Sequence, residues 1–336
     1  MCRIPARMLR HAPAGVKPRL AATPVCGVVF ASNASALGIG MDWQKGRQSD
    51  NVVEDDGSGG GGGGGGGMRF GGFHLGIGGT ILAVIVALIF PQTRPFIMDL
   101  FLNGGGGVDT SQPASAPPAP GRAANLNDPQ HDFVSRVLGS TEDVWGAYFK
   151  AAGSQYERPK LDLFHGRTRS GCGAAEESMG PFYCPADHRV YLDLDFFHEM
   201  DTRFHATGDF ARAYVIAHEV GHHVQNLLGI MQKVGDRPTE GATGTSVRLE
   251  LQADCFAGVW GNRSQQQLDW LHAGDIEAAL NAAAQVGDDT LQKSARGYAV
   301  PDSFTHGTSA QRTRWFKAGY DSGDIKSCDT FGASTL

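Results

Sequence analysis

The stretch FARAYVIAHEVGHHVQNLL, residues 210–228, decides the fold, because it predicts a helix that is buried along much of its length. Asp209 precedes it as a candidate N-cap, and Gly229 follows it as a stop signal. Gly221 is unfavourable inside a helix, which indicates a closely packed backbone neighbour or a nearby metal ion. The apolar side chains that would seat the helix in a core are Tyr214, Ile216 and Val220.

The helix contains HEVGH at residues 218–222, which matches the H-E-x-x-H pattern typical of zinc metallopeptidases. His218 and His222 are one helical turn apart, so they lie on one face and can bind the same metal ion. Glu219 lies beside them and can take a proton from a zinc-bound water. His223 points about 100° away from His222 and is interpreted as a packing residue or as a partner of a ligand.

A catalytic zinc ion usually takes three protein ligands, and the best third ligand is Glu250. Residues 249–259 are predicted to form a helix, on which Glu250 and Asp254 share a face. Asp254 is then placed to accept the second ring N–H of a ligand histidine. The alternative is a solvated acidic face, which the apolar neighbours of these carboxylates disfavour.

The stretch THGTSAQR at residues 305–312 supplies two further candidates, His306 and Arg312. Either side chain could polarise the substrate carbonyl or stabilise an oxyanion. The alternative is an ordinary surface loop followed by a helix that is capped at Thr308 or Ser309.

Four segments of the chain, HEVGHH, ELQADCFAG, MGPFYCPAD and PDSFTHGTSAQR, together resemble the bacterial membrane-anchored "putative neutral zinc metallopeptidase" family. The resemblance begins at Met41 and covers nearly everything to the C-terminus, apart from a glycine tract and a linker. It implies one N-terminal membrane anchor and a gluzincin-like domain that holds one Zn²⁺ per chain.

In that family arrangement Glu219 would be the catalytic base, and the zinc ligands would be His218, His222 and Glu250. The spacing of His306 and Arg312 is also similar to an element of CaaX-prenyl-type membrane zinc proteases. The resemblance implies no particular substrate beyond a protein or peptide.

The composition limits both the function class and the number of domains. A net charge of −6 argues against a nucleic-acid partner. The 47 glycines and 16 prolines lie mostly outside the motifs, which favours one core over two.

An apolar, uncharged run over residues 75–90 predicts a transmembrane helix within residues 71–92. The alternative, a buried core helix, is disfavoured because glycine tracts flank the run. Residues 1–40 carry basic residues and no acidic ones, so they are interpreted as a leader or as an upstream translated segment. The expected remaining segments are a disordered Gly-rich region at 41–70, a flexible Gly/Pro/Ala linker at 93–124 and the metallopeptidase domain at 125–336.

Four cysteines fall in that domain, and an even number favours disulfides and an oxidising compartment. One of the three possible pairings joins Cys172 to Cys184 and Cys255 to Cys328. A structural zinc site is the alternative, but the usual C-x2-C pairs are missing. Basic residues before the apolar run mildly favour an internal N-terminus. We therefore expect a single-pass protein of the bacterial cytoplasmic membrane with its C-terminal domain outside the cytoplasm.

Helical periodicity at 128–152 and 275–286, with short alternating strands at 160–164 and 190–194, predicts an α+β fold of zincin type. It should be mostly helical with a small sheet. The strand at 189–195 is expected to lie along the cleft, where its edge could pair with an extended peptide.

The sequence thus predicts a zinc-dependent endopeptidase in which Glu219 is the general base for a zinc-activated water. A second hypothesis is a membrane-tethered interaction protein with a structural zinc site. A zinc hydrolase that acts on something other than peptides is a third.

Overall fold

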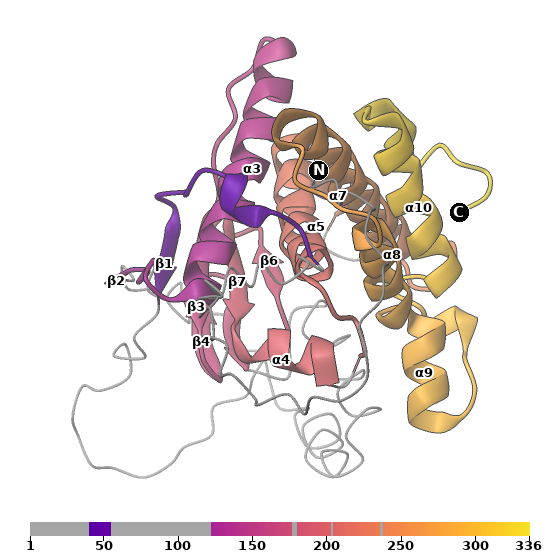
Figure 1. Ribbon diagram of the computed structural model, residues 1–336. Coiled ribbons are helices and arrows are strands. Elements are labelled where there is room, and N and C mark those ends of the chain that lie inside the picture. Colours follow the sequence, from indigo (N-terminus) through magenta and orange to yellow (C-terminus); the bar gives the residue numbers. More distant parts are fainter. Residues whose placement is uncertain (1–39, 55–121, 177–179, 203, 236–237) are drawn as a thin grey trace, which may run out of the picture. The chain divides into compact units, whose positions relative to one another are not determined.

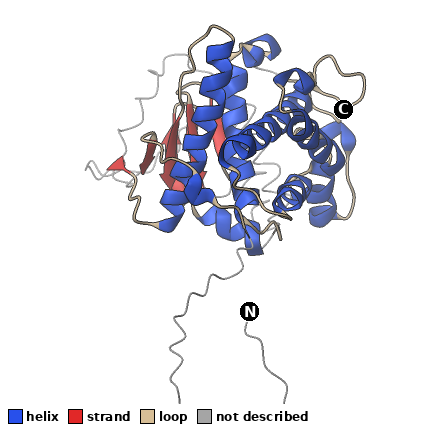
Figure 2. Cartoon of the chain, turned by 45° about the horizontal axis from the view of Figure 1, so that its top comes forward, coloured by secondary structure: helices blue, strands red, loops and turns tan. Residues whose placement is uncertain are grey.

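The computed structural model describes residues 40–54, 122–176, 180–202, 204–235 and 238–336. These residues form a mixed α+β fold in which a small sheet packs against a larger set of helices (Figure 1). Most of the helices lie on one side of the sheet (Figure 2). This confirms the α+β class that the sequence predicts.

The main sheet of the described chain has five strands in the order β2-β1-β3-β7-β6. Strands β1, β3 and β7 run parallel, whereas β2 and β6 pair antiparallel at the two ends. The bounds are Val52–Glu54 for β1, Arg122–Ala123 for β2, Lys160–Phe164 for β3, Phe182–Cys184 for β6 and Arg189–Asp193 for β7. A separate hairpin joins β4, Arg167–Ser170, to β5, Gly173–Glu176.

Strand β7 is not an edge strand, which corrects the expectation that it could pair with a substrate. It is hydrogen-bonded to β3 on one side and to β6 on the other. Its residues from Val190 to Asp193 are buried, as expected for a central strand. The sequence showed the strand but not its two neighbours.

The helices of the described chain include one that follows β2, one that follows β7 and a C-terminal group. Their bounds are Pro129–Ala151 for α3, Asp195–Thr202 for α4, Asp209–Leu227 for α5, Ile230–Val234 for α6, Thr245–Leu268 for α7, Asp275–Gln285 for α8, Asp288–Arg296 for α9 and Ser309–Ser322 for α10. Short 3-10 turns cover Trp43–Lys45, Pro301–Ser303 and Ile325–Cys328.

Two glycine contacts bring α5, α7 and α10 together. A Cβ atom on Gly221 of α5 would lie 3.0 Å from the carbonyl oxygen of Ala253 in α7. A Cβ atom on Gly319 of α10 would overlap the carbonyl oxygen of Cys255, also in α7. The close backbone neighbour that Gly221 indicated is therefore α7, the helix that carries Glu250.

Residues 41–54 belong to the folded domain, which corrects the expected disordered region and the domain start near residue 125. Met41 and Val52 are buried in the main core. The Asp42 N–H donates to the carbonyl of Trp270 at 2.7 Å. Strand β1 pairs with β3 from Val52↔Leu161 onward. A three-residue strand whose partner lies far along the chain has no strong local signal.

The expected leader at 1–40, apart from its last residue, and the expected transmembrane helix at 71–92 lie outside the described residues, as does the linker up to residue 121. Among the helices that are described, none has the combination of length and apolarity that crossing a bilayer requires.

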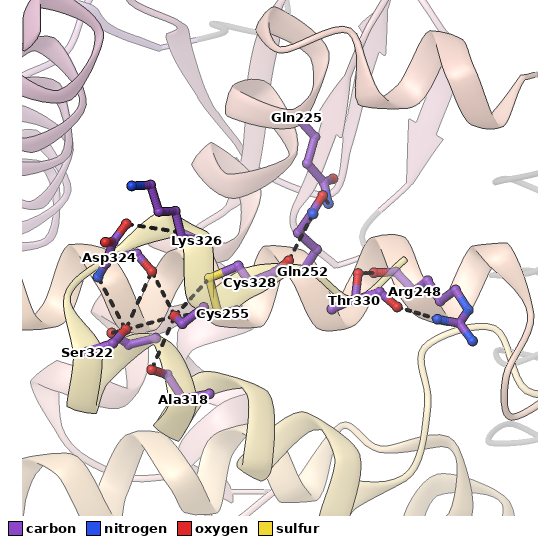
Figure 3. The surroundings of a disulfide bond; sticks show 12 residues. Gln225, Arg248, Gln252, Cys255, Ala318, Ser322, Asp324, Lys326, Cys328 and Thr330 are labelled. Carbon is purple, nitrogen blue, oxygen red and sulfur yellow. Dashed lines mark hydrogen bonds between the residues drawn. A yellow bond between two sulfur atoms is a disulfide. The ribbon is translucent and has the colours of Figure 1, made fainter. Parts of the chain in front are cut away.

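Two disulfides join the cysteine pairs that the sequence suggested. Cys172, in the turn between β4 and β5, is bonded to Cys184 at the end of β6. Cys255 in α7 is bonded to Cys328 in the turn after α10. The second disulfide ties the C-terminal segment to the helix that carries Glu250 (Figure 3).

Candidate metal centre

The three predicted metal ligands meet between α5 and α7. Suitable ligand atoms of His218, His222 and Glu250 all lie within 4.8 Å of one another. The Nε2 atom of His218 is 3.3 Å from Oε2 of Glu250, and Nε2 of His222 is 3.5 Å from Oε1. Two imidazoles and one carboxylate are a donor set that suits Zn²⁺ and leaves a position open for water.

The pKa shifts in this group keep Glu250 ionised but favour a protonated His218 when no metal is bound. Burial by itself raises the pKa of Glu250, but the nearby histidines His222, His306 and His218 hold it well below its usual value. Burial lowers the pKa of His218, yet the Asp254 carboxylate raises it to about 10. Without a metal, His218 therefore keeps a proton, and a metal ion has to replace that proton at Nε2.

Asp254 orients His218, as the sequence predicted. Its Oδ1 lies 2.9 Å from Nδ1 of His218 and also accepts the hydroxyl of Tyr214 at 2.5 Å. Burial raises the pKa of Asp254, but Arg312 and His218 lower it to about 2, so the carboxylate stays charged. A charged acceptor at Nδ1 directs Nε2 toward the metal position.

Arg312 does not have the predicted oxyanion role. Its side chain is buried, and its Nε and Nη2 donate to the two oxygens of Asp254, each at 2.9 Å. Its Nη1 donates to the carbonyl of Val286 at 3.3 Å. With its donors held in this way behind His218, the guanidinium compensates the buried charge of Asp254 rather than contacting substrate.

His306 remains a candidate for a substrate contact, since its half-buried ring lies near the metal ligands. Burial lowers its pKa, whereas the carboxylates of Glu250 and Asp288 raise it above its usual value. Asp288 also accepts the backbone N–H groups of Thr305, His306 and Gly307 at 2.7 to 3.0 Å. This carboxylate fixes the loop and thereby the position of the His306 ring. Thr308 then caps α10.

Glu219 follows His218 directly on α5. Its side chain is largely buried, and burial raises its pKa, an effect that the charges of His218 and His222 oppose. Within the described residues its carboxylate accepts no hydrogen bond from another side chain, so it is available to a water molecule. A raised pKa makes it a better proton acceptor.

His223 is a packing residue and not a ligand. The ring is fully buried and lies 2.7 Å from the carbonyl oxygen of Glu157 and 3.1 Å from the hydroxyl of Tyr183. Burial lowers its pKa to about 4, so it is neutral at physiological pH.

Gln225, which sequence analysis did not single out, contacts a ligand. Its Oε1 lies 2.9 Å from Nδ1 of His222. The available signal was its position three residues after His222 on the same helix, where side chains meet.

A second group of possible ligands, His165, Asp193 and Asp195, also brings donor atoms close together. Here Asp193 already accepts the backbone N–H of Gly166 at 3.1 Å and that of Asp195 at 3.0 Å. These bonds explain why the carboxylate is buried, since it joins the turn after β3 to the first residue of α4. The group of His218, His222 and Glu250 is therefore the candidate metal centre.

Residues 41–331 match the model of a family described as "Putative neutral zinc metallopeptidase". The uncharacterized protein YpfJ of Escherichia coli strain K12 is 49% identical over 300 residues, which is 88% of this chain and 100% of that protein. The uncharacterized protein Rv2575 of Mycobacterium tuberculosis strain H37Rv is 44% identical over 214 residues, 61% of this chain and 73% of that protein. No solved structure matches the chain.

Proposed function

Since the chain belongs to the family of "putative neutral zinc metallopeptidases", we propose that it is a zinc-dependent endopeptidase. The observation that supports this best is the meeting of His218, His222 and Glu250. The carboxylate of Glu219 lies beside them on α5 and accepts no side-chain hydrogen bond within the described part of the chain. We propose that the substrate is a protein or peptide.

When bound there, Zn²⁺ would polarise the scissile carbonyl and lower the pKa of a bound water toward ~7. Glu219 takes a proton from the attacking water and passes it to the leaving amine. We propose that His306, whose pKa the Glu250 carboxylate helps to raise, donates a hydrogen bond to the oxygen on which charge develops. Asp254 and Arg312 act at a distance from the substrate, by holding the ring of His218.

The interaction-protein alternative, with a structural zinc site, is less well supported. Structural zinc sites usually have four protein ligands, whereas this group of described residues has three. A structural site would also have no use for a buried carboxylate such as Glu219 next to the ligands.

The location of the protein is a separate proposal. The two disulfides support a domain in an oxidising compartment outside the cytoplasm. The apolar run within residues 71–92 supports attachment to the cytoplasmic membrane.

The function is tested on the full-length protein by comparing it with its Glu219→Gln variant. Bound zinc and cleavage of unfolded casein are measured for both. We expect equal zinc content and a loss of activity of about 10²- to 10⁴-fold in the variant, because a general base is removed without removing a ligand.

A Glu240→Gln variant is the matched control, since Glu240 is exposed and belongs to none of these contacts. Undiminished cleavage by Glu219→Gln would exclude the proposed mechanism. Zinc binding without cleavage in any form would favour the interaction protein instead.

A further inference from the structure

A line of amide side chains connects the second histidine ligand to the C-terminal segment. Oε1 of Gln225 lies 2.9 Å from Nδ1 of His222. Nε2 of Gln225 donates to the carbonyl of Leu249 at 2.8 Å and to Oε1 of Gln252 at 3.1 Å. Nε2 of Gln252 donates to the carbonyl of Cys328 at 3.0 Å. Figure 3 shows Gln225, Gln252 and Cys328 in sequence, beside the disulfide to Cys255.

The orientation of both amides follows from their partners. A backbone carbonyl can only accept hydrogen bonds, so the NH₂ group of Gln252 must face Cys328 and that of Gln225 must face Leu249. The oxygen of Gln225 is then the atom that faces His222. That oxygen can only accept, so Nδ1 of His222 must carry the hydrogen.

Burial makes the reversed arrangement costly. Gln225 is 0% exposed and Gln252 is 7% exposed. A flipped Gln225 would place its oxygen against the carbonyl oxygen of Leu249 and the amide oxygen of Gln252, and leave acceptors unsatisfied. Each unsatisfied buried polar group costs about 1–3 kcal/mol.

We propose that Gln225 and Gln252 are positioning residues that hold His222 in its Nδ1–H tautomer and direct Nε2 toward the metal. The inference rests on the metal site of the proposed function. The two histidines are thus oriented differently, His218 by the charged Asp254 and His222 by a neutral amide. The disulfide to α7 fixes Cys328, whose carbonyl ends the line.

The test measures zinc affinity by chelator competition, without substrate, for four variants of the full-length protein. Gln225→Leu should weaken binding about 10- to 100-fold, as is typical when the partner of a ligand histidine is lost. Gln225→Glu keeps an acceptor for Nδ1–H, but its second oxygen faces the carbonyl of Leu249 and Oε1 of Gln252, so it should recover only part of this loss. Gln252→Leu should weaken binding less, because it removes only the support of Gln225. Gln232→Leu, which removes an amide that contacts Asn226, should bind zinc as the parent does.

A second measurement needs no variant. Imidazole ¹⁵N chemical shifts of His222 in the zinc-loaded parent should show a protonated Nδ1. A protonated Nε2, or zinc affinity of Gln225→Leu equal to that of the parent, would overturn the proposal. Zinc binding as expected with no peptide cleavage would instead count against the proposed function alone.

Discussion

The orientation of the metal ligand His218 depends on Asp254. The carboxylate of Asp254 is fully buried and accepts hydrogen bonds from Tyr214, His218 and Arg312. Its charge is tolerated in the core because a buried guanidinium compensates it. The sequence indicated Asp254 through its i, i+4 spacing from Glu250. The sequence could not show that Arg312 is the partner of Asp254, because the two residues lie on different helices, α10 and α7, that are far apart in the chain.

The role of Arg312 leads to a first prediction. Arg312→Met removes the larger of the two charges that compensate the buried Asp254, so the free energy of unfolding should fall by about 3–5 kcal/mol. Zinc affinity should fall with it. Denaturant unfolding and chelator competition measure the two effects.

Arg314→Met is the control, because Arg314 lies on the exposed side of α10. A variant of Arg312 that keeps its stability and zinc but loses turnover would show that the guanidinium contacts the substrate after all.

A substitution of His306 should affect turnover and not zinc binding, in contrast to the substitution of Arg312. His306→Ala removes a side chain that holds no metal, so zinc content should stay equal to that of the parent. The turnover number should fall about 10²- to 10³-fold, as for the loss of an oxyanion donor. Steady-state kinetics on a peptide substrate decide this. An unchanged turnover number would mean that His306 does not contact the substrate and only forms part of the loop that Asp288 holds in place.

At the level of elements, some helices could be predicted closely and the sheet only in part. Helix α7 extends at both ends beyond the expected 249–259, and α4, α6 and α9 were not predicted. The long apolar periodicity around residues 133–148 and 210–228 gave α3 and α5 with ends close to those observed. Strand β1 was missed because its three residues form a strand only against β3. The helix that carries Glu250 was predicted. Its close approach to α10, which a glycine in α10 permits, was not predicted.

That helix contact leads to a prediction about stability. In Gly319→Ala, the new methyl group would overlap the carbonyl of Cys255, which belongs to a backbone that cannot yield. Overpacking of this kind should cost about 1–3 kcal/mol or more, against a gain of about 1 kcal/mol in helix propensity. Thermal or denaturant unfolding measures the balance.

Gly146→Ala in α3 supplies the matched comparison, because a Cβ atom there meets nothing within 4 Å. It should stabilise the protein. Equal stabilisation by both substitutions would mean that the backbones of α7 and α10 are not in close contact at Gly319.

At the scale of the whole molecule, the chain leaves the sheet and returns to it at the same place. Glu54, the last residue of β1, is the antiparallel partner of Arg122, the first residue of β2. The N–H of Ala124 donates to the carbonyl of Val52, and hydrogen-bonded pairs alternate along such a ladder. Glu54 and Arg122 are therefore a pair that a two-residue turn can close.

A variant in which Asn-Gly replaces residues 55–121 should consequently fold. It should bind zinc as the parent does and remain soluble without detergent, because the apolar run is removed. A fragment that begins at residue 125 should be markedly less stable, since it lacks Met41 and Val52 from the core. Zinc titration and thermal unfolding compare the two, and equal stability would show that residues 41–54 contribute little.

The same geometry constrains how the chain can meet a membrane. If residues 71–92 crossed a bilayer once, β1 and β3 would lie on opposite sides and could not pair. We therefore expect residues before and after the apolar run to lie on the same side, in contrast to a single-pass arrangement.

Single cysteines at the exposed positions Asp50 and Asn127, with Cys2 and Cys26 changed to Ser, test this in intact cells with a membrane-impermeant thiol reagent. If the domain lies outside the cytoplasm, as proposed, both sites should react, because they flank β1 and β2 of one sheet. Reaction at Asn127→Cys alone would support a single crossing of the membrane by residues 71–92. It would also mean that β1 does not pair with β3 in the membrane-bound protein.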